Sequence, residues 1–475
     1  MRKALCILLL AGSVYANASD PIRHALTDTT QIEMSVQASC AENTSDFMPW
    51  KGSGMRTIGF EAHAVKDLSD ADRIWGSAAY EYGRKIQIKW NETSDFMLLY
   101  PYLTADSLGG NMNSERYLFE GGYSHRWTHA HLGGQFRYRA LQEYRSSDPR
   151  PLNVVADLTV SVVGGWVLDN QYILSSDISY RRYKQNSHID FYSEIGSFRT
   201  YNLTGLGTWS YRFSGNTNQS YYRGNGLTAT VDIRRNDLQG WQAEAAYELF
   251  AYEKILPDIN NITLCALRTQ RAYGDVQYQT DRWLFGAEYN YELRKGYEYL
   301  YGDAAGNAYN LLARQDQYYA ATHAISAHIR RNDTFGRLHM SIEPIIGLNS
   351  HSWKYKQPLR LIETTHITSQ LRYEMNYTWL KQHKLAWDIS IGYDPCITQH
   401  NDLTTSSPAQ ITHEMLTTIA TYLRTDRIHG QVSVRFDLHT GHRINWFVGI
   451  HGAEIRHLNP NADEWQICLQ SGITL

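Results

Sequence analysis

The sequence lacks three features that would each have pointed to a familiar class of protein. Its five cysteines lie at positions 6, 40, 265, 396 and 468, too few and too scattered for a zinc ribbon or a small disulfide scaffold. It has no basic surplus, since 45 Lys and Arg face 48 Asp and Glu for a net charge of -3, which argues against a nucleic-acid partner. No internal stretch reaches the ~18 apolar residues of a membrane helix.

The first residues have the pattern of an export signal. Arg2 and Lys3 precede an apolar run over residues 4–12, and Ala16 and Ala18 form a small-residue cleavage site. We expect a signal peptide over residues 1–18, and the alternative is a buried N-terminal helix. Export would place the protein outside the inner membrane.

What the chain has in abundance is aromatic side chains, with 34 Tyr, 13 Trp and 13 Phe, arranged in strictly alternating segments. In the segment 283–294, Trp283 and Phe285 share one face while Glu288 and Glu292 share the other. Alternation over eight to twelve residues predicts a strand, because successive side chains point to opposite faces. About nineteen such segments follow one another, including 201–213 and 411–425, and none shows a helical stripe.

Long alternating strands joined by short turns and longer polar loops predict an all-β fold, a transmembrane antiparallel up-and-down β-barrel of the outer membrane. Bacterial single-chain barrels have an even strand number, so we predict about 18 strands, with 16 and 20 as alternatives. The alternating segment 32–39 is a candidate for a strand missing from the count. The expected layout is a short periplasmic segment over residues 19–48 and the barrel over residues 49–475. A soluble propeller or tandem sandwich is the alternative.

If the apolar faces meet lipid, the charged faces of the same strands enclose the lumen. Charges of both signs there indicate water, since the same groups facing lipid would cost a few kcal/mol each near the midplane. Such a lumen is either an aqueous channel tuned by its charges or a closed interior braced by ion pairs. The predicted lumen-facing residues are Glu244, Glu248, Glu288, Glu292, Arg372, Glu374, Asp388, Arg435 and Asp437.

Two tyrosine-rich stretches, residues 220–224 and 296–302, fall in candidate loops. Exposed aromatic rings with a polar rim can bind sugars or partner proteins, although such rings can also pack on their own loop. The candidate contact residues are Tyr221, Tyr222, Tyr297, Tyr299 and Tyr301.

No motif indicates catalysis, a metal site or a cofactor. His413 and Glu414 begin like a zinc-protease helix, but the second histidine is missing. A barrel hydrolase whose catalytic residues are scattered over several strands remains an alternative. A TonB-dependent transporter needs 22 strands and a plug domain before the barrel, and residues 19–48 are too few for one, so no TonB coupling is implied.

Several stretches resemble an uncharacterised family of Bacteroidota outer-membrane β-barrel proteins, described only as a domain of unknown function. They are Tyr100–Gly110, Ser114–Tyr123, Gly133–Ala140, Ser147–Asn153 and Tyr183–Gln185. The resemblance covers most of the chain from about residue 45 and implies the barrel fold and the outer membrane as location. It implies no functional residues.

The function that these patterns favour is a passive channel, or an accessory component of an outer-membrane transport system. Outer-membrane lipid is the expected environment, and a transport or assembly complex is the candidate partner. A structural or protein-binding barrel with a closed lumen is the second hypothesis, and the barrel hydrolase is the third.

Overall fold

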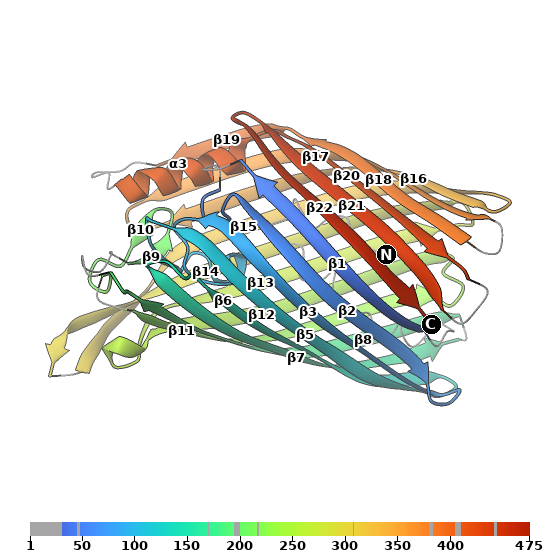
Figure 1. Cartoon of the computed structure of the whole chain (residues 1–475), viewed down its shortest axis with the longest axis horizontal. Helices are drawn as coiled ribbons and strands as arrows, with labels where there is room; N and C mark the ends of the chain where they lie inside the picture. Colours follow the sequence, from blue (N-terminus) through green and yellow to red (C-terminus); the bar gives the residue numbers. More distant parts are fainter. Residues whose placement is uncertain are drawn as a thin grey trace.

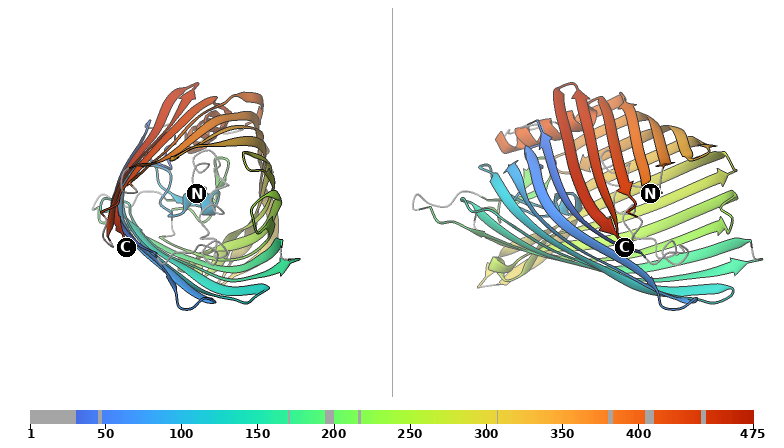
Figure 2. Two further views of the ribbon diagram at one scale, coloured as in Figure 1. Left: turned by 90° about the vertical axis from the view of Figure 1, so that its right-hand side faces the viewer. Right: turned by 45° about the vertical axis from the view of Figure 1, so that its right-hand side comes forward.

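The computed structural model is a closed antiparallel β-barrel (Figures 1 and 2). It describes residues 31–44, 48–169, 171–193, 200–215, 218–306, 308–379, 383–403, 410–440 and 444–475. The predicted signal peptide over residues 1–18 lies outside these ranges. The first and last strands, β1 and β22, pair with each other from Glu33 to Asn43 and close the sheet. The predicted fold is therefore confirmed.

The described residues form 18 strand positions in the barrel wall, as predicted. The sheet contains 19 strands, but β18 and β19 are consecutive pieces that both pair with β17 and share one position. The wall strands are β1 (Gln31–Asn43), β2 (Gly54–Asp67), β3 (Asp72–Ile88), β5 (Gly110–Arg126), β6 (Ala130–Tyr144), β7 (Arg150–Leu168), β8 (Tyr172–Asp190), β11 (Gln219–Arg235), β12 (Gly240–Leu256), β13 (Ile262–Gln279), β14 (Trp283–Ala305), β15 (Ala308–Phe335), β16 (Leu338–Tyr355), β17 (Arg360–Trp379), β18 (His383–Asp394), β19 (Cys396–Asp402), β20 (Arg427–Leu438), β21 (Asn445–Leu458) and β22 (Asn461–Thr474).

The outer surface carries the apolar half of the alternation. On β7, Val160, Val162 and Trp166 are 46%, 56% and 57% exposed, whereas the intervening Ser161 and Val163 are 4% and 2% exposed. Large exposed apolar side chains recur in this way around the wall. Such a surface is stable where hydrocarbon covers it, and the polar half of each strand then encloses the lumen.

The two ends of the barrel differ in their connections. Short turns such as residues 68–71 and 280–282 lie at one end, which we call the turn end. The connections at the opposite end, the loop end, include residues 89–109 and the segment between β19 and β20. In Figure 1 the turn end is on the right, where the described chain begins and ends.

Two long connections fold back into the loop end of the barrel. Residues 89–109, between β3 and β5, contain the helix α2 (Phe96–Leu99) and the strand β4 (Thr104–Ala105). Residues 200–215, between β8 and β11, contain β9 (Tyr201–Gly205) and β10 (Thr208–Trp209). The strands β10, β9 and β4 form a small separate sheet. We call residues 89–109 and 200–215 the plug, which is visible inside the barrel in the end-on view of Figure 2.

The plug and the wall share one buried apolar cluster. Leu99, Tyr102 and Leu103 of the plug are completely buried in it. Its wall members come from strands around the circumference and include Leu141, Val155, Tyr183, Tyr222, Phe250, Leu267, Tyr318, Tyr355, Ile362 and Ala462. Contact on so many sides means that the plug is packed against the wall as a domain core is packed.

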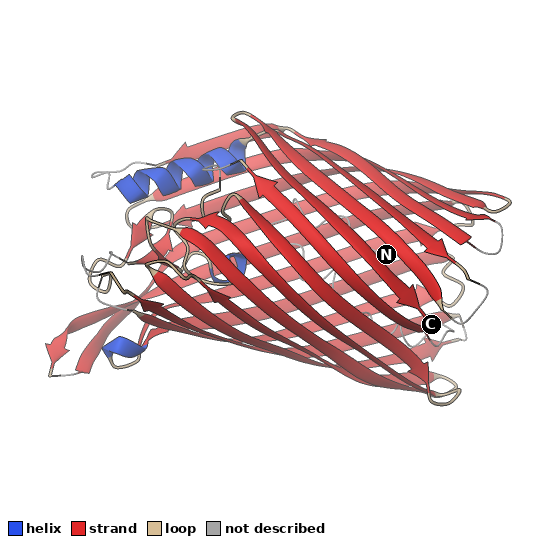
Figure 3. Ribbon diagram, in the orientation of Figure 1, coloured by secondary structure: helices blue, strands red, loops and turns tan. Residues whose placement is uncertain are grey.

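The predicted strand at residues 201–213 is wrong, because these residues form β9, β10 and their turn in the plug. The predicted strand at residues 411–425 is also wrong, because it is the helix α3 (Gln410–Arg424) at the loop end (Figure 3). Met415, Leu416, Ile419, Tyr422 and Leu423 are buried along one side of this helix. These buried positions repeat every 3.6 residues, and this period is the signal in the sequence that favours a helix over a strand.

The barrel begins earlier than predicted. Residues 32–39, the candidate for a missing strand, lie in β1, which pairs with β2 and β22. The boundary at residue 49 is therefore too late, because β1 is a wall strand.

A single-turn 3-10 helix, η1 (Pro257–Ile259), joins β12 to β13. Within the described ranges, none of the helices is long and apolar enough to cross a membrane.

Candidate functional site

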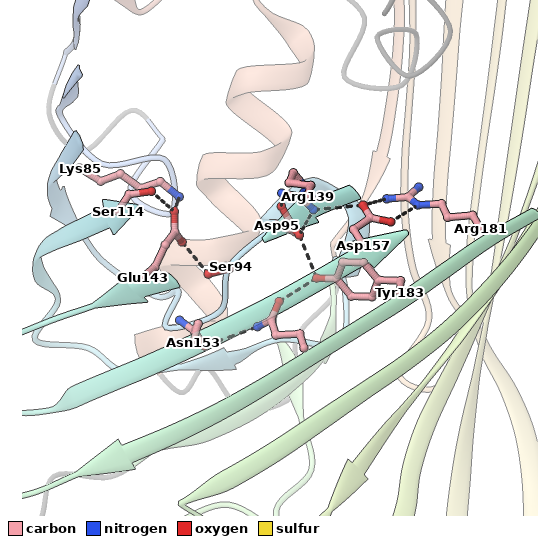
Figure 4. A network of polar contacts seen from close by, with 11 residues as sticks. Lys85, Ser94, Asp95, Ser114, Arg139, Glu143, Asn153, Asp157, Arg181 and Tyr183 are labelled. Carbon is pink, nitrogen blue, oxygen red and sulfur yellow. Dashed lines mark hydrogen bonds and ion pairs between the residues drawn. The ribbon is translucent and has the colours of Figure 1, made fainter. Parts of the chain in front are cut away.

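The candidate site is the polar contact surface between the plug and the wall (Figure 4). At its centre Asp95, which precedes α2 with a left-handed backbone (φ 52°), receives two hydrogen bonds from Arg139 on β6, at 2.9 and 2.6 Å. The Tyr183 hydroxyl on β8 donates a third, at 2.9 Å. Burial by itself would raise the pKa of Asp95, but Arg139 and Tyr183 lower it below its ordinary value. The plug therefore presents an ionised carboxylate to a cation of the wall.

The same ion pair continues along the wall as a chain of alternating charges. Arg139 also contacts Asp157 on β7 at 3.2 Å, and Arg181 on β8 donates two hydrogen bonds to Asp157, at 2.8 and 2.7 Å. The Arg181 guanidinium lies over the Phe250 ring, 5.0 Å from its centroid. Because Arg139 and Asp157 each have an opposite charge on both sides, and Asp95 and Arg181 each have one, the cost of removing these groups from water is offset locally.

A second polar contact holds the start of α2. Glu143 on β6 accepts hydrogen bonds from Ser94 at 2.6 Å and from Ser114 at 3.1 Å, and its carboxylate lies 2.6 Å from the Lys85 ammonium. Asn153 on β7 donates to the main-chain carbonyl of Glu92 at 2.8 Å. Wall side chains thus determine the path of the plug main chain from residue 92 to residue 95.

The two ends of residues 89–109 meet in a buried carboxyl pair. The carboxyl groups of Glu92 and Asp106 lie beside each other, and Arg145, which follows β6, lies 3.5 and 3.0 Å from them. Burial, followed by the neighbouring Asp106, raises the pKa of Glu92 well above its usual range. At Asp106, burial is outweighed by the neighbouring Glu92 and by the charge of Arg145, which lower the pKa. These shifts favour a neutral Glu92 beside an ionised Asp106, where the two ends of residues 89–109 meet.

Wall cations also bind main-chain carbonyls of the plug. Lys254 on β12 is fully buried, and its ammonium donates to the Leu103 carbonyl at 2.9 Å and to Thr104 Oγ1 at 3.1 Å. Arg294 on β14 donates to the carbonyls of Met97 and Leu98 at 2.9 and 2.7 Å. At these carbonyls the wall supplies donors that water would otherwise provide.

Further contacts of this kind come from Tyr222, Tyr252 and Arg360, which donate to the carbonyls of Tyr102, Leu99 and Leu206. The fit is close at Gly296 on β14. A Cβ atom at this position would lie 2.2 Å from the Tyr102 hydroxyl oxygen. The wall is therefore shaped to admit the plug as well as to bind it.

Four strands of the wall, β11 to β14, have a different character towards the turn end, because four carboxylates lie side by side there. Asp232, Glu244, Asp275 and Glu288 are directly paired across β11, β12, β13 and β14. Their sequence neighbours, such as Val231 at 50% and Val276 at 48%, are exposed on the outer surface, so the carboxylates point inward. Like charges directly opposite each other are unfavourable in a sheet. We call these four residues the acidic row.

The nine residues predicted to face the lumen lie in four groups. Glu244 and Glu288 belong to the acidic row. Glu248 and Glu292 both bind the buried Arg271, at 3.0 and 2.6 Å. The remaining members form ion pairs of their own: Arg372 binds Asp388 and Glu374, and Arg435 binds Asp437 and Glu33.

The predicted aromatic loop residues lie in strands. Tyr221 and Tyr222 belong to β11, where Tyr222 is fully buried against the plug. Tyr297, Tyr299 and Tyr301 belong to β14, which continues well past the position expected from the sequence. The two stretches are therefore not loops, because alternation continues through both of them.

The plug-binding residues were missed from the sequence because nothing local distinguishes them. Asp95, Arg139 and Lys254 become neighbours only when the plug enters the barrel. A weak signal was available: residues 89–109 form a long interval between strands, yet they contain Trp90, Leu99 and other apolar side chains that an exposed loop would not favour. In the described part of the chain, no group of three or more His, Cys, Asp or Glu side chains is placed to hold a metal ion.

Comparisons with solved structures find distant likenesses. FpvA of Pseudomonas aeruginosa, whose structure holds a bound pyoverdine and iron, is 8% identical with a TM-score of 0.45, covering 94% of this chain and 72% of that one. The ferric preacinetobactin receptor BauA of Acinetobacter baumannii is 8% identical with a TM-score of 0.42, covering 94% and 80%. The outer-membrane protein opdK of P. aeruginosa is 10% identical with a TM-score of 0.33, covering 94% and 99%. Likenesses this distant carry no argument about function.

A comparison with curated protein sequences finds no match. A family model described as a family of unknown function, DUF6850, matches residues 26–475. The match spans the complete barrel wall and both plug segments. The chain therefore belongs to the DUF6850 family of unknown function.

Proposed function

We propose that this protein is an outer-membrane channel for small polar solutes, with a preference for cations, whose extracellular opening is closed at rest by its own plug. It reaches the outer membrane through a cleaved signal peptide over residues 1–18, and its source is a member of the Bacteroidota. The loop end faces the outside, because outer-membrane barrels place long connections there and short turns in the periplasm.

The observation that carries the proposal is the contrast between the two halves of the lumen. At the loop end, wall residues from β6 to β17 hold the plug through ion pairs, carbonyl contacts and a buried apolar cluster. Towards the turn end, the wall presents the acidic row. A ring or row of carboxylates favours cations in a water-filled passage. A barrel of 18 strands is wide enough for such a passage once the plug moves.

Conductance of the refolded protein in planar bilayers tests the proposal. We expect the wild type to give little or no steady conductance, and Asp95→Ala, which removes a plug contact, to give discrete cation-preferring steps. Asp70→Ala, in an exposed turn at the other end, is the matched control and should behave as the wild type. Stable wide-pore conductance of the wild type would contradict closure by the plug.

The second candidate is a permanently closed barrel that serves as an accessory or structural component of an outer-membrane complex. The complete burial of Leu99, Tyr102 and Leu103 favours it, since a core of that kind is costly to open. Absence of conductance steps from Asp95→Ala, in a protein that retains heat-modifiable migration on gels, would select this candidate.

We expect neither enzymatic activity nor TonB coupling. Labelling of the purified protein with a serine-directed fluorophosphonate tests the first expectation, and covalent labelling would overturn it. Fractionation of cells with gel migration before and after boiling tests the location, and a soluble, unshifted protein would contradict it.

A further inference from the structure

The outer surface of the wall near the loop end carries a patch of basic side chains. Arg268 on β13 lies between Leu267 and Thr269, which are buried on the lumen side with 1% and 3% exposure. Alternation therefore turns Arg268 outward, because successive side chains of a strand point to opposite faces. Five further cations also lie next to buried, inward-facing residues, which are Tyr183, Tyr222, Arg294 and Tyr355. We call the six outward cations the basic rim: Arg182, Lys184, Arg223, Arg268, Lys295 and Lys354.

Strand pairing places members of the basic rim directly opposite one another. Arg268 on β13 is the cross-strand partner of Lys295 on β14, and Lys184 on β8 is the partner of Arg223 on β11. Like charges in this position repel each other and destabilise a sheet. Four of the six cations also belong to one row of successive partners that runs from β8 to β16, and these are Arg182, Arg268, Lys295 and Lys354.

The carboxylates beside the basic rim already have partners. Glu253 on β12 binds Arg223 at 2.9 Å, and Asp316 on β15 binds Lys356. Among the described residues, the other five members of the basic rim form no ion pair, and Arg182 donates a hydrogen bond to the neutral Asn225 side chain. The wall therefore gathers cations without supplying the anions that would offset their repulsion.

The apolar surface begins directly beside the basic rim. Two residues nearer the turn end on their strands, Tyr180, Leu227 and Leu249 are successive cross-strand partners and are 50%, 51% and 39% exposed. Hydrocarbon that covers these side chains places the lipid headgroups at the level of the cations. Lysine and arginine can lay their aliphatic stems along such a surface and present the charge to the headgroups.

We propose that the basic rim binds the phosphate groups of anionic lipid headgroups in the leaflet at the loop end. A lipid is favoured over a soluble acidic protein, because one lipid molecule can meet the cations with its head and the neighbouring apolar row with its chains. Clustered basic residues at a membrane surface attract anionic lipid in this way. The proposal holds whether or not the lumen conducts, so conductance and lipid binding fail or succeed separately.

Native mass spectrometry of the full-length protein in detergent counts the lipids that stay bound. The probes are dioleoylphosphatidylglycerol, whose headgroup has a net negative charge, and dioleoylphosphatidylcholine, which has the same chains and no net charge. We expect the wild type to bind the anionic lipid about tenfold or more tightly than the zwitterionic one. Inorganic phosphate should not displace the bound lipid more than chloride does at the same ionic strength, because phosphate has no apolar chain.

Substitutions in the basic rim test which residues are responsible. A basic residue near an anionic membrane surface contributes about fivefold in affinity, so Arg268→Gln with Lys295→Gln should weaken binding of the anionic lipid about 30-fold. Binding of the zwitterionic lipid should stay the same. Lys184→Gln with Lys354→Gln is a second, independent pair with the same expectation.

Two controls match these variants. Arg268→Lys with Lys295→Arg keeps both charges at the same positions and should retain tight binding. Arg56→Gln with Arg456→Gln removes two exposed cations at the same end of the barrel, each of which already faces a carboxylate at 3.8 Å, and should also leave binding unchanged. Because all these side chains lie on the outer surface, heat-modifiable migration should be retained throughout.

Three results would overturn the proposal. Equal affinity of the wild type for the two lipids would show that the chains alone are bound. Unchanged binding of the anionic lipid in both glutamine pairs of the basic rim would place the anion elsewhere on the protein. Displacement of the lipid by inorganic phosphate would assign the cations to a free anion.

Discussion

Replacing Asp95 with alanine should loosen the plug without unfolding the barrel. The change removes two short charge-assisted hydrogen bonds from Arg139 and one from Tyr183. Hydrogen bonds to charged groups contribute about 1.5–3 kcal/mol each, and breaking a buried ion pair costs about 3–5 kcal/mol. Arg139 keeps Asp157 as a partner, so we expect a loss of about 2–3 kcal/mol in the free energy that holds the plug closed.

Hydrogen exchange measured by mass spectrometry reports this loss directly. If amides of residues 89–109 exchange through local opening, a loss of about 2–3 kcal/mol speeds their exchange roughly 30- to 140-fold. Exchange in wall strands distant from the plug, such as β21, should stay the same. Asp70→Ala is the control, because Asp70 lies in an exposed turn at the other end of the barrel.

The double substitution Asp95→Ala with Arg139→Met sharpens the test. Removing both partners leaves no unpaired charge at the contact, and Asp157 retains its two hydrogen bonds from Arg181. Part of the lost protection should therefore return. Unchanged exchange of residues 89–109 in Asp95→Ala would refute the reasoning, since the ion pair would then contribute nothing to plug closure.

Three further predictions concern other parts of the lumen. The pKa of Glu92 is raised in the closed plug, so the stability contributed by its neutral form is fully present below its ordinary pKa of 4.5 and declines as pH rises from there towards the raised value. The protection of residues 89–109, which is the intrinsic exchange rate of an unprotected amide at the same pH divided by the observed rate, should fall over that range, and Glu92→Gln should remove this fall. Arg271→Met leaves Glu248 and Glu292 without their shared cation, and should lower the free energy of unfolding of the barrel by about 3–5 kcal/mol. Gel migration of unboiled samples over a series of temperatures measures this loss, and an unfolding transition at the wild-type temperature would contradict it. Glu244→Gln with Glu288→Gln, in the Asp95→Ala background, should reduce cation preference in reversal-potential measurements, and an unaltered preference would count against the acidic row as the selective element.

Which face of each strand meets lipid was predictable from the sequence. Alternation is local: Val160 and Val162 point outward because residues two apart in a strand share a face, whatever the rest of the chain does. The same local rule placed Glu248 and Arg372 on the opposite face. It also predicted about 18 strands, because closure in lipid leaves no free sheet edge and bacterial barrels are even-numbered.

Local rules failed where a segment contacts residues distant in sequence. Residues 201–213 alternate, yet they pair within the plug and not with a wall strand. This is possible because the inner side of the wall is a surface against which a short strand can pack. Residues 411–425 contain both a helical stripe and alternating positions, and packing on the apolar cluster decides for the helix.

The sequence by itself determined an alternating ribbon with one apolar face, and so a membrane barrel with a charged interior. Only the tertiary structure decided that this interior is occupied at the loop end. Asp95 and Arg139 are 44 residues apart, and Lys254 and Leu103 are 151 apart. Their attraction depends on barrel closure, which brings the wall around the plug and excludes the water that would otherwise satisfy each group separately.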